Sequence, residues 1–163
     1  MQQFKMKSAL ASLLLMSFSS LAGDLMVHDA WIRAMPPTSR VVPLYLTLHN
    51  GGDKELVLSS IASPRGEIAL HQTVQEGEMM KMLPVDSIRI PAHGMVKLEP
   101  QGLHAMMSDF NAGVPEQGEE VSLQLTLADG ETLQAKARVT QFGGKGQDSA
   151  NADQGMHDHS MHH

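Results

Sequence analysis

The sequence predicts an all-β fold, an antiparallel β-sandwich, from strand alternation, regularly spaced turns and the lack of a sustained helical period. Residues 42–49 read V-P-L-Y-L-T-L-H, so that Leu44, Leu46 and Leu48 alternate with more polar side chains. Alternation of this kind is typical of a strand with one buried face. We therefore expect a sheet whose apolar face packs against a second layer.

The remaining strand candidates are short and are separated by turn residues. Asn50-Gly51-Gly52-Asp53 supplies one turn, and Asp129-Gly130 is a hairpin signal between the alternating segments 121–127 and 133–139. Further candidates are 26–34, 55–61, 67–72, 80–83, 87–90 and 95–98. Strands spaced by about 8 to 12 residues favour a sandwich of the immunoglobulin-like or cupredoxin-like kind.

The chain is expected to hold one folded domain between two segments of different character. Residues 1–22 combine Lys5 and Lys7 with an apolar run and the small residues of Ser20-Leu21-Ala22, which predicts a cleaved signal peptide. From residue 142 the composition turns to Gly, Gln, Asp, Ser and Asn, which favours a disordered C-terminal tail over 142–163. The folded domain is therefore expected over 23–141, in an exported protein.

Charge and cysteine content exclude several classes of function. Without residues 1–22 the chain keeps 10 basic and 18 acidic residues, a formal charge of −8, which argues against nucleic-acid binding. No later segment approaches the roughly 20 apolar residues of a membrane span, so none is expected in the mature chain. The absence of Cys excludes disulfides, thiolate catalysis and thiolate metal sites.

Methionine is unusually frequent, with 13 residues against four Phe, one Trp and one Tyr. Many of these Met fall in two clusters, 77–82 and 103–108, and the second cluster also contains His104. A single Met is usually an adaptable core residue, but that explanation accounts less well for Met beside His. In an extended segment, His104 and Met106 would leave the same face about 7 Å apart, and Met80 and Met82 would share a face likewise.

Four of these residues have a specific spacing. Ten residues separate His71 from Met82, twenty-one separate Met82 from His104, and one separates His104 from Met106. With segments 29–37 and 45–50, this pattern resembles the PCu(A)C family of periplasmic copper chaperones, over residues 27–139. The resemblance implies that His71, Met82, His104 and Met106 bind Cu(I) in the periplasm. It also implies delivery to the CuA site of cytochrome c oxidase subunit II, with a Sco-type copper chaperone as partner.

The chemistry of the four side chains favours the same metal. Thioethers are soft and neutral, so two Met with two His favour Cu(I) over zinc, magnesium or calcium. No carboxylate accompanies the set as a general base, so we expect no enzyme activity. An electron-transfer cupredoxin would need a Cys ligand, which this chain lacks.

The C-terminal residues form a second, auxiliary candidate site. Imidazoles and thioethers alternate there with Asp and Ser, which suggests a metal-gathering tail that should prefer Cu(II). Its candidate ligands are Met156, His157, His159, Met161, His162 and His163. The alternative is an idle tail or a purification remnant.

The other His residues and Trp31 are predicted to have structural roles. His28, His49 and His93 have no Met or second His at a useful spacing, so we interpret them as surface residues, whereas Trp31 is predicted to lie in the core.

Two functions compete with copper delivery. One is periplasmic copper buffering or resistance, and the other is a metal-free β-sandwich that binds other proteins through its Met clusters.

Overall fold

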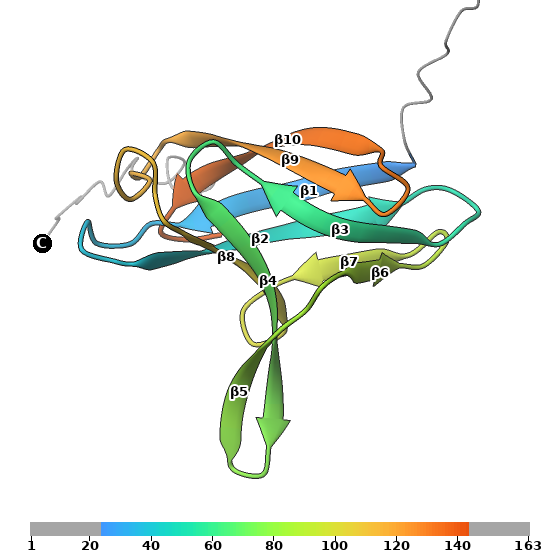
Figure 1. Ribbon diagram of the computed structural model, residues 1–163, viewed down its shortest axis with the longest axis horizontal. Coiled ribbons are helices and arrows are strands. Elements are labelled where there is room, and N and C mark those ends of the chain that lie inside the picture. Colours follow the sequence, from blue (N-terminus) through green and yellow to red (C-terminus); the bar gives the residue numbers. More distant parts are fainter. Residues whose placement is uncertain (1–23, 144–163) are drawn as a thin grey trace, which may run out of the picture.

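The computed structural model describes residues 24–143, and every regular element within them is a strand (Figure 1). The all-β prediction is confirmed, and no helix among these residues is long and apolar enough to cross a membrane. The predicted signal peptide, 1–22, lies outside the described residues. The strands are β1 Leu25–Arg33, β2 Val41–Asn50, β3 Leu56–Ala62, β4 Glu67–Glu76, β5 Met79–Pro84, β6 Ile88–Ile90, β7 Met95–Leu98, β8 Leu103–Ser108, β9 Glu120–Leu127 and β10 Thr132–Thr140.

The strands form one ladder in the order β5-β4-β8-β2-β1-β10-β9-β3-β6. β7 also pairs with β2, so that β8 adjoins the first half of β2 and β7 adjoins the second half. All pairings are antiparallel except that of β1 with β10, which is parallel. This parallel pair, formed by the first and last described strands, is the one departure from the wholly antiparallel sheet that the sequence predicts.

The ladder of strands folds over on itself, and the apolar side chains of its inner face meet to form the core. Leu44, Leu46 and Leu48 of β2 are all at most 2% exposed, as their alternation predicts. They join Leu123 and Leu125 of β9 in a single buried cluster. The opposite face of β2 is therefore left to carry other side chains.

Trp31 departs from its predicted place in the core. It is only partly buried and packs against Tyr45, with ring centroids 4.7 Å apart. A bulge in β1 between His28 and Trp31 causes this, because the inserted residue changes which side chains share a face. Trp31 thus lies on the outer face of the sheet.

β4 and β5 form a long hairpin that projects from the body of the molecule (Figure 1). The sequence predicts a strand over 67–72 with His71 near its end, but β4 continues to Glu76. The reason is tertiary: residues 71 and 72 pair with both β8 and β5, and residues 73–76 are extended by pairing with β5 alone. His71 therefore lies in mid-strand, where the hairpin leaves the body.

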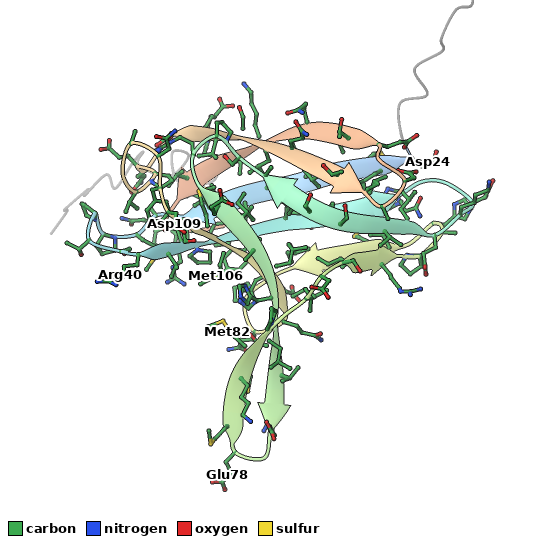
Figure 2. The ribbon with its side chains drawn as sticks, viewed as in Figure 1. Asp24, Arg40, Glu78, Met82, Met106 and Asp109 are labelled. Carbon is green, nitrogen blue, oxygen red and sulfur yellow. The ribbon has the colours of Figure 1, made fainter. Side chains whose placement is uncertain are left out.

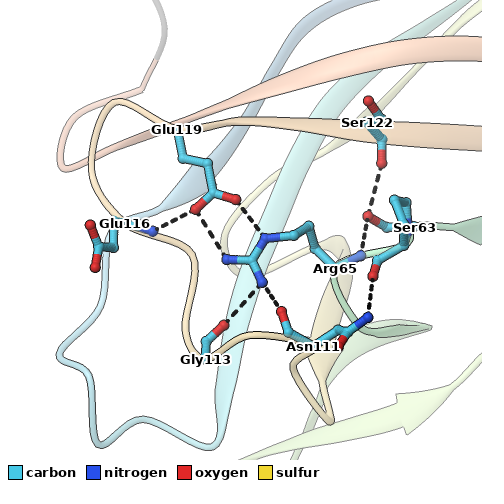
Figure 3. A network of polar contacts seen from close by, with 8 residues as sticks. Ser63, Arg65, Asn111, Gly113, Glu116, Glu119 and Ser122 are labelled. Atoms are coloured by element: carbon cyan, nitrogen blue, oxygen red, sulfur yellow. Dashed lines mark hydrogen bonds and ion pairs between the residues drawn. The ribbon is translucent and has the colours of Figure 1, made fainter.

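An ion pair holds the turn before β4 to the loop that follows β8 (Figure 3). Arg65 Nε donates to Glu119 Oε1 at 2.5 Å and Nη2 donates to Oε2 at 3.1 Å. The Arg65 guanidinium also donates to the backbone carbonyls of Asn111 and Gly113. The hydrogen bond from Arg65 lowers the pKa of Glu119, and this bond likewise raises the pKa of Arg65.

Candidate metal centre

The four predicted ligands share one face of three adjacent strands. His71 on β4 lies directly opposite His104 on β8, and Ala69 lies opposite Met106. On the other side of β4, Thr73 lies opposite Met82 of β5. Because directly opposed residues and residues two apart point to the same side of a sheet, all four side chains lie on the same face.

His104 is the most buried member of the set, at 6% exposed. Its Nδ1 lies 3.0 Å from the carbonyl oxygen of Gly102, which can only accept, so Nδ1 carries the proton. In the neutral ring, the lone pair is then on Nε2. His104 Nε2 lies 3.2 Å from the Met82 sulfur, which can accept a hydrogen bond only weakly and cannot donate one. In this contact, two atoms that each carry a lone pair face one another.

The Gly102 carbonyl also fixes the neighbouring strand. It accepts a hydrogen bond from the backbone N–H of Thr73 at 3.1 Å. Since Thr73 is the cross-strand partner of Met82, one oxygen orients His104 and supports the strand that carries the thioether. Such a bond to the second ring nitrogen is how proteins fix the orientation of metal-binding imidazoles.

His71 completes the pair of imidazoles. Its ring stacks on that of His104 with centroids 5.9 Å apart and 22° between the planes. Its Nδ1 is buried and finds no hydrogen-bond partner within the described part of the chain. An unpartnered buried nitrogen is unfavourable unless another ligand satisfies it.

Met82, His104 and Met106 line one open cavity of about 340 Å³. Figure 2 shows Met82 and Met106 near the base of the hairpin, whereas Glu78 lies at its tip. Met80 lines the same cavity, as its shared face with Met82 predicts. His71 is not among the lining residues, so it contacts the site from beside His104.

The spacing of these donors fits a shared soft ion. In tetrahedral coordination, bonds of about 2.0 Å to nitrogen and 2.3 Å to sulfur place those two atoms about 3.5 Å apart. The observed 3.2 Å between His104 Nε2 and Met82 Sδ needs only a few tenths of an ångström of opening. The spacing of His104 and Met82 therefore suits one soft ion, and His71 and Met106 lie on the same face.

Within residues 24–143, no group of three or more His, Cys, Asp and Glu side chains is arranged to hold a metal ion. The cation nearest to the cavity, Lys81, lines it and is paired with the Glu76 carboxylate. Tyr45 forms part of the wall, and its burial raises the pKa of its hydroxyl. The Tyr45 side chain thus stays neutral, and the donors around the cavity are uncharged.

The other Met residues of the two clusters have different environments. Met107 is fully buried in the core, and Met79 is 64% exposed beside the hairpin turn. Met106 and Met107 face opposite sides of β8, as the two-residue spacing of Met106 from His104 predicts, since adjacent residues of a strand alternate. The auxiliary ligands of the tail, Met156, His157, His159, Met161, His162 and His163, lie outside the described residues.

Comparison with a family model gives a match over most of the folded region. The family described as putative lipoprotein LpqE-like matches residues 25–139. A comparison with curated protein sequences gives no match.

Solved structures share the fold. The copper-bound PCuAC domain from PmoF2 has a TM-score of 0.61 at 19% identity, covering 72% of this chain and 92% of that one. The solution structure of apo-DR1885 from Deinococcus radiodurans gives 0.58 at 28%, covering 87% and 95%. The CuI-DR1885 structure from the same organism gives 0.54 at 33%, covering 71% and 76%.

Proposed function

Because this chain belongs to the LpqE-like family and resembles PCuAC domains, we propose that it is a periplasmic Cu(I)-binding metallochaperone. His71, Met82, His104 and Met106 are its ligands, and the copper is cargo that the protein passes on without catalysing a reaction. The names of the similar structures support copper as the metal, and the CuI-DR1885 structure supports its reduced state. The lipoprotein character of the family supports export.

The observation that carries this proposal is the contact between His104 Nε2 and Met82 Sδ. Two electron-pair donors held 3.2 Å apart gain nothing from each other, but both gain from a soft cation between them. The unpartnered Nδ1 of His71 beside them adds a second nitrogen donor. Met106, on the same face, adds the second thioether.

The unequal exposure of the ligands suits release to a partner. His104 is 6% exposed, whereas Met82 is 59% exposed. An acceptor can therefore reach the ion from the side of β5 and replace Met82 while the imidazoles still hold the copper. Neutral thioethers also bind less tightly than thiolates, so a cysteine-bearing acceptor would be favoured.

The proposed acceptor is the CuA site of cytochrome c oxidase subunit II, reached together with a Sco-type copper chaperone. The support for this step is the resemblance to PCu(A)C chaperones and the ligand chemistry. Since Cu(I) enters and leaves in the same oxidation state, transfer itself needs no oxidant or reductant.

A transfer assay tests the proposal. The full exported chain is loaded with one equivalent of Cu(I) without oxygen, mixed with the reduced apo copper domain of subunit II, and the proteins are separated for copper analysis. We expect copper to move to the acceptor from the wild type, and the M82L/M106L variant to bind at least tenfold more weakly at this site. Unchanged binding by that variant would refute the ligand assignment, and retention of copper by the wild type would refute this acceptor.

Copper buffering is the second candidate function, supported by the ten His and Met ligands of the core site and tail together. It differs from delivery in needing no specific acceptor. Growth at high copper and oxidase assembly, compared in a variant without the tail, therefore separate the two functions.

A further inference from the structure

A second group of two His and two Met lies on the outer face of the sheet, away from the site described above. Its members are Met26 and His28 on β1, His49 on β2 and Met95 on β7. His49 is the cross-strand partner of Met26 on one side and of Met95 on the other. His28 lies two residues from Met26, so it shares the same face, and the prediction that His28 and His49 have no Met at a useful spacing does not hold.

The spacing of the two imidazoles fits a shared ion. The ring centroids of His28 and His49 are 6.4 Å apart, with 42° between the planes. Two imidazoles bound to one ion at about 2.0 Å have centroids about 5 to 6 Å apart, so a small side-chain rotation closes the pair. Thioethers directly opposite His49 have Cβ atoms about 5 Å from its own, within reach of the same ion.

The backbone around His49 is firmly held. The N–H of Asn50 donates to the Gly94 carbonyl at 2.9 Å, and the N–H of Gly51 donates to the Asp24 carbonyl at 2.8 Å. These bonds tie Gly94, next to Met95, and Asp24, two residues before Met26, to the end of β2. The buried Asn50 side chain fixes the turn further, by donating to the Lys54 and Ile90 carbonyls.

Both thioethers are accessible. Met26 is 42% exposed and Met95 is 55% exposed, so an ion in solution can reach either side chain. The Met26 methyl carbon also lies beside Gly51, 3.4 Å from where a Cβ at that position would stand. His28 and Met95 both line an open cavity of about 560 Å³.

We propose that Met26, His28, His49 and Met95 form a second Cu(I) site. Soft, neutral donors select a soft ion over hard dications. The site is distinct from the first, because β2 residues 43 and 49 are separated by about 20 Å of strand. In Figure 2, Asp24, just before this group, lies at the far end of the molecule from Arg40, which precedes β2.

Methionine-methyl NMR of the full exported chain tests this proposal, with Cu(I) added without oxygen. The M82L/M106L background removes the first site. We expect the Met26 and Met95 methyl resonances to shift together and to saturate, and H49A to weaken this response at least tenfold. Met35, which is 36% exposed and lies apart from these residues, is the matched control and should not shift.

Several outcomes would overturn the second site. One is that the Met26 and Met95 resonances do not shift when Cu(I) is added. Another is that they shift in H28A and H49A as much as in the background protein. A third is an equal response to Zn(II), which thioethers bind poorly. In the wild-type chain, Met82 and Met106 report on the first site, so failure of the proposed function is seen separately.

Discussion

His71 and His104 face each other across β4 and β8, and their rings stack at 5.9 Å although thirty-two residues lie between them in sequence. This pairing brings two imidazoles to the base of a projecting hairpin. Met82 arrives from the returning strand of that hairpin, 3.2 Å from His104. The register of three strands thus assembles the donors.

Met106 and Met107 should respond oppositely to substitution. Met106→Leu keeps an apolar side chain on the outer face, so we expect a change in stability below about 1.5 kcal/mol and at least a tenfold loss of Cu(I) affinity. Met107→Ala removes a fully buried side chain and should lower the free energy of unfolding by about 2 to 5 kcal/mol. Urea unfolding and Cu(I) competition titration measure the two effects, and matching behaviour of both variants would contradict the assigned faces.

The tautomer of His104 should be fixed before copper binds. Because Nδ1 donates to the Gly102 carbonyl, the metal-free protein should show a protonated Nδ1 and an unprotonated Nε2. Nitrogen-15 NMR of the imidazole rings distinguishes these atoms, and Cu(I) should shift the Nε2 resonance most. His93, whose Nε2 lies 2.6 Å from Asp53, serves as a control that copper leaves unchanged. Observation of an Nε2–H on neutral His104 would contradict this geometry.

Glu119→Gln should destabilise the protein at neutral pH by about 1 to 3 kcal/mol, since it removes a charged partner of a guanidinium. The hydrogen bond from Arg65 holds the pKa of the Glu119 carboxyl below that of an ordinary glutamate. A lowered pKa stabilises the fold above the unfolded-state value, and this contribution is lost as the pH falls through the folded-state value. The stability difference between wild type and variant should therefore shrink below about pH 4.5.

The exposed pair of Arg89 and Glu55 provides the control for that measurement. Its side chains are 77% and 46% exposed, so Glu55→Gln should change stability by less than about 1 kcal/mol. Unfolding followed in urea at several pH values measures both variants. A Glu119→Gln variant as stable as the wild type at neutral pH would show that the ion pair does not hold the loop.

Removal of residues 144–163 should separate copper delivery from copper buffering. Every member of the buried cluster lies between residues 25 and 139, so the midpoint of thermal unfolding should be unchanged. If the protein is a delivery chaperone, oxidase assembly should survive and only growth at high copper should fall. Loss of oxidase assembly in cells that produce the shortened protein at normal levels would place an essential step in the tail.

Strand alternation predicted most of the fold. The leucines of β2 and the alternating residues of β9 and β10 were enough to indicate buried faces, because a strand repeats every two residues. The length of β4 was not predictable, since its second half is extended only through pairing with β5. The place of Trp31 was missed for a similar reason: the bulge after His28 shifts which residues share a face.

By itself, the sequence determined which soft donors are available: a chain without Cys can offer thioethers but no thiolates beside its imidazoles. The spacing of four such residues, together with segments 29–37 and 45–50, also indicated a resemblance to the PCu(A)C copper chaperones. Only the tertiary structure decided which donors meet. Register places Met82 beside His104 and places Met26 and Met95 on either side of His49. Cross-strand partners are set by hydrogen-bonded pairing between distant segments, and no local pattern encodes that pairing.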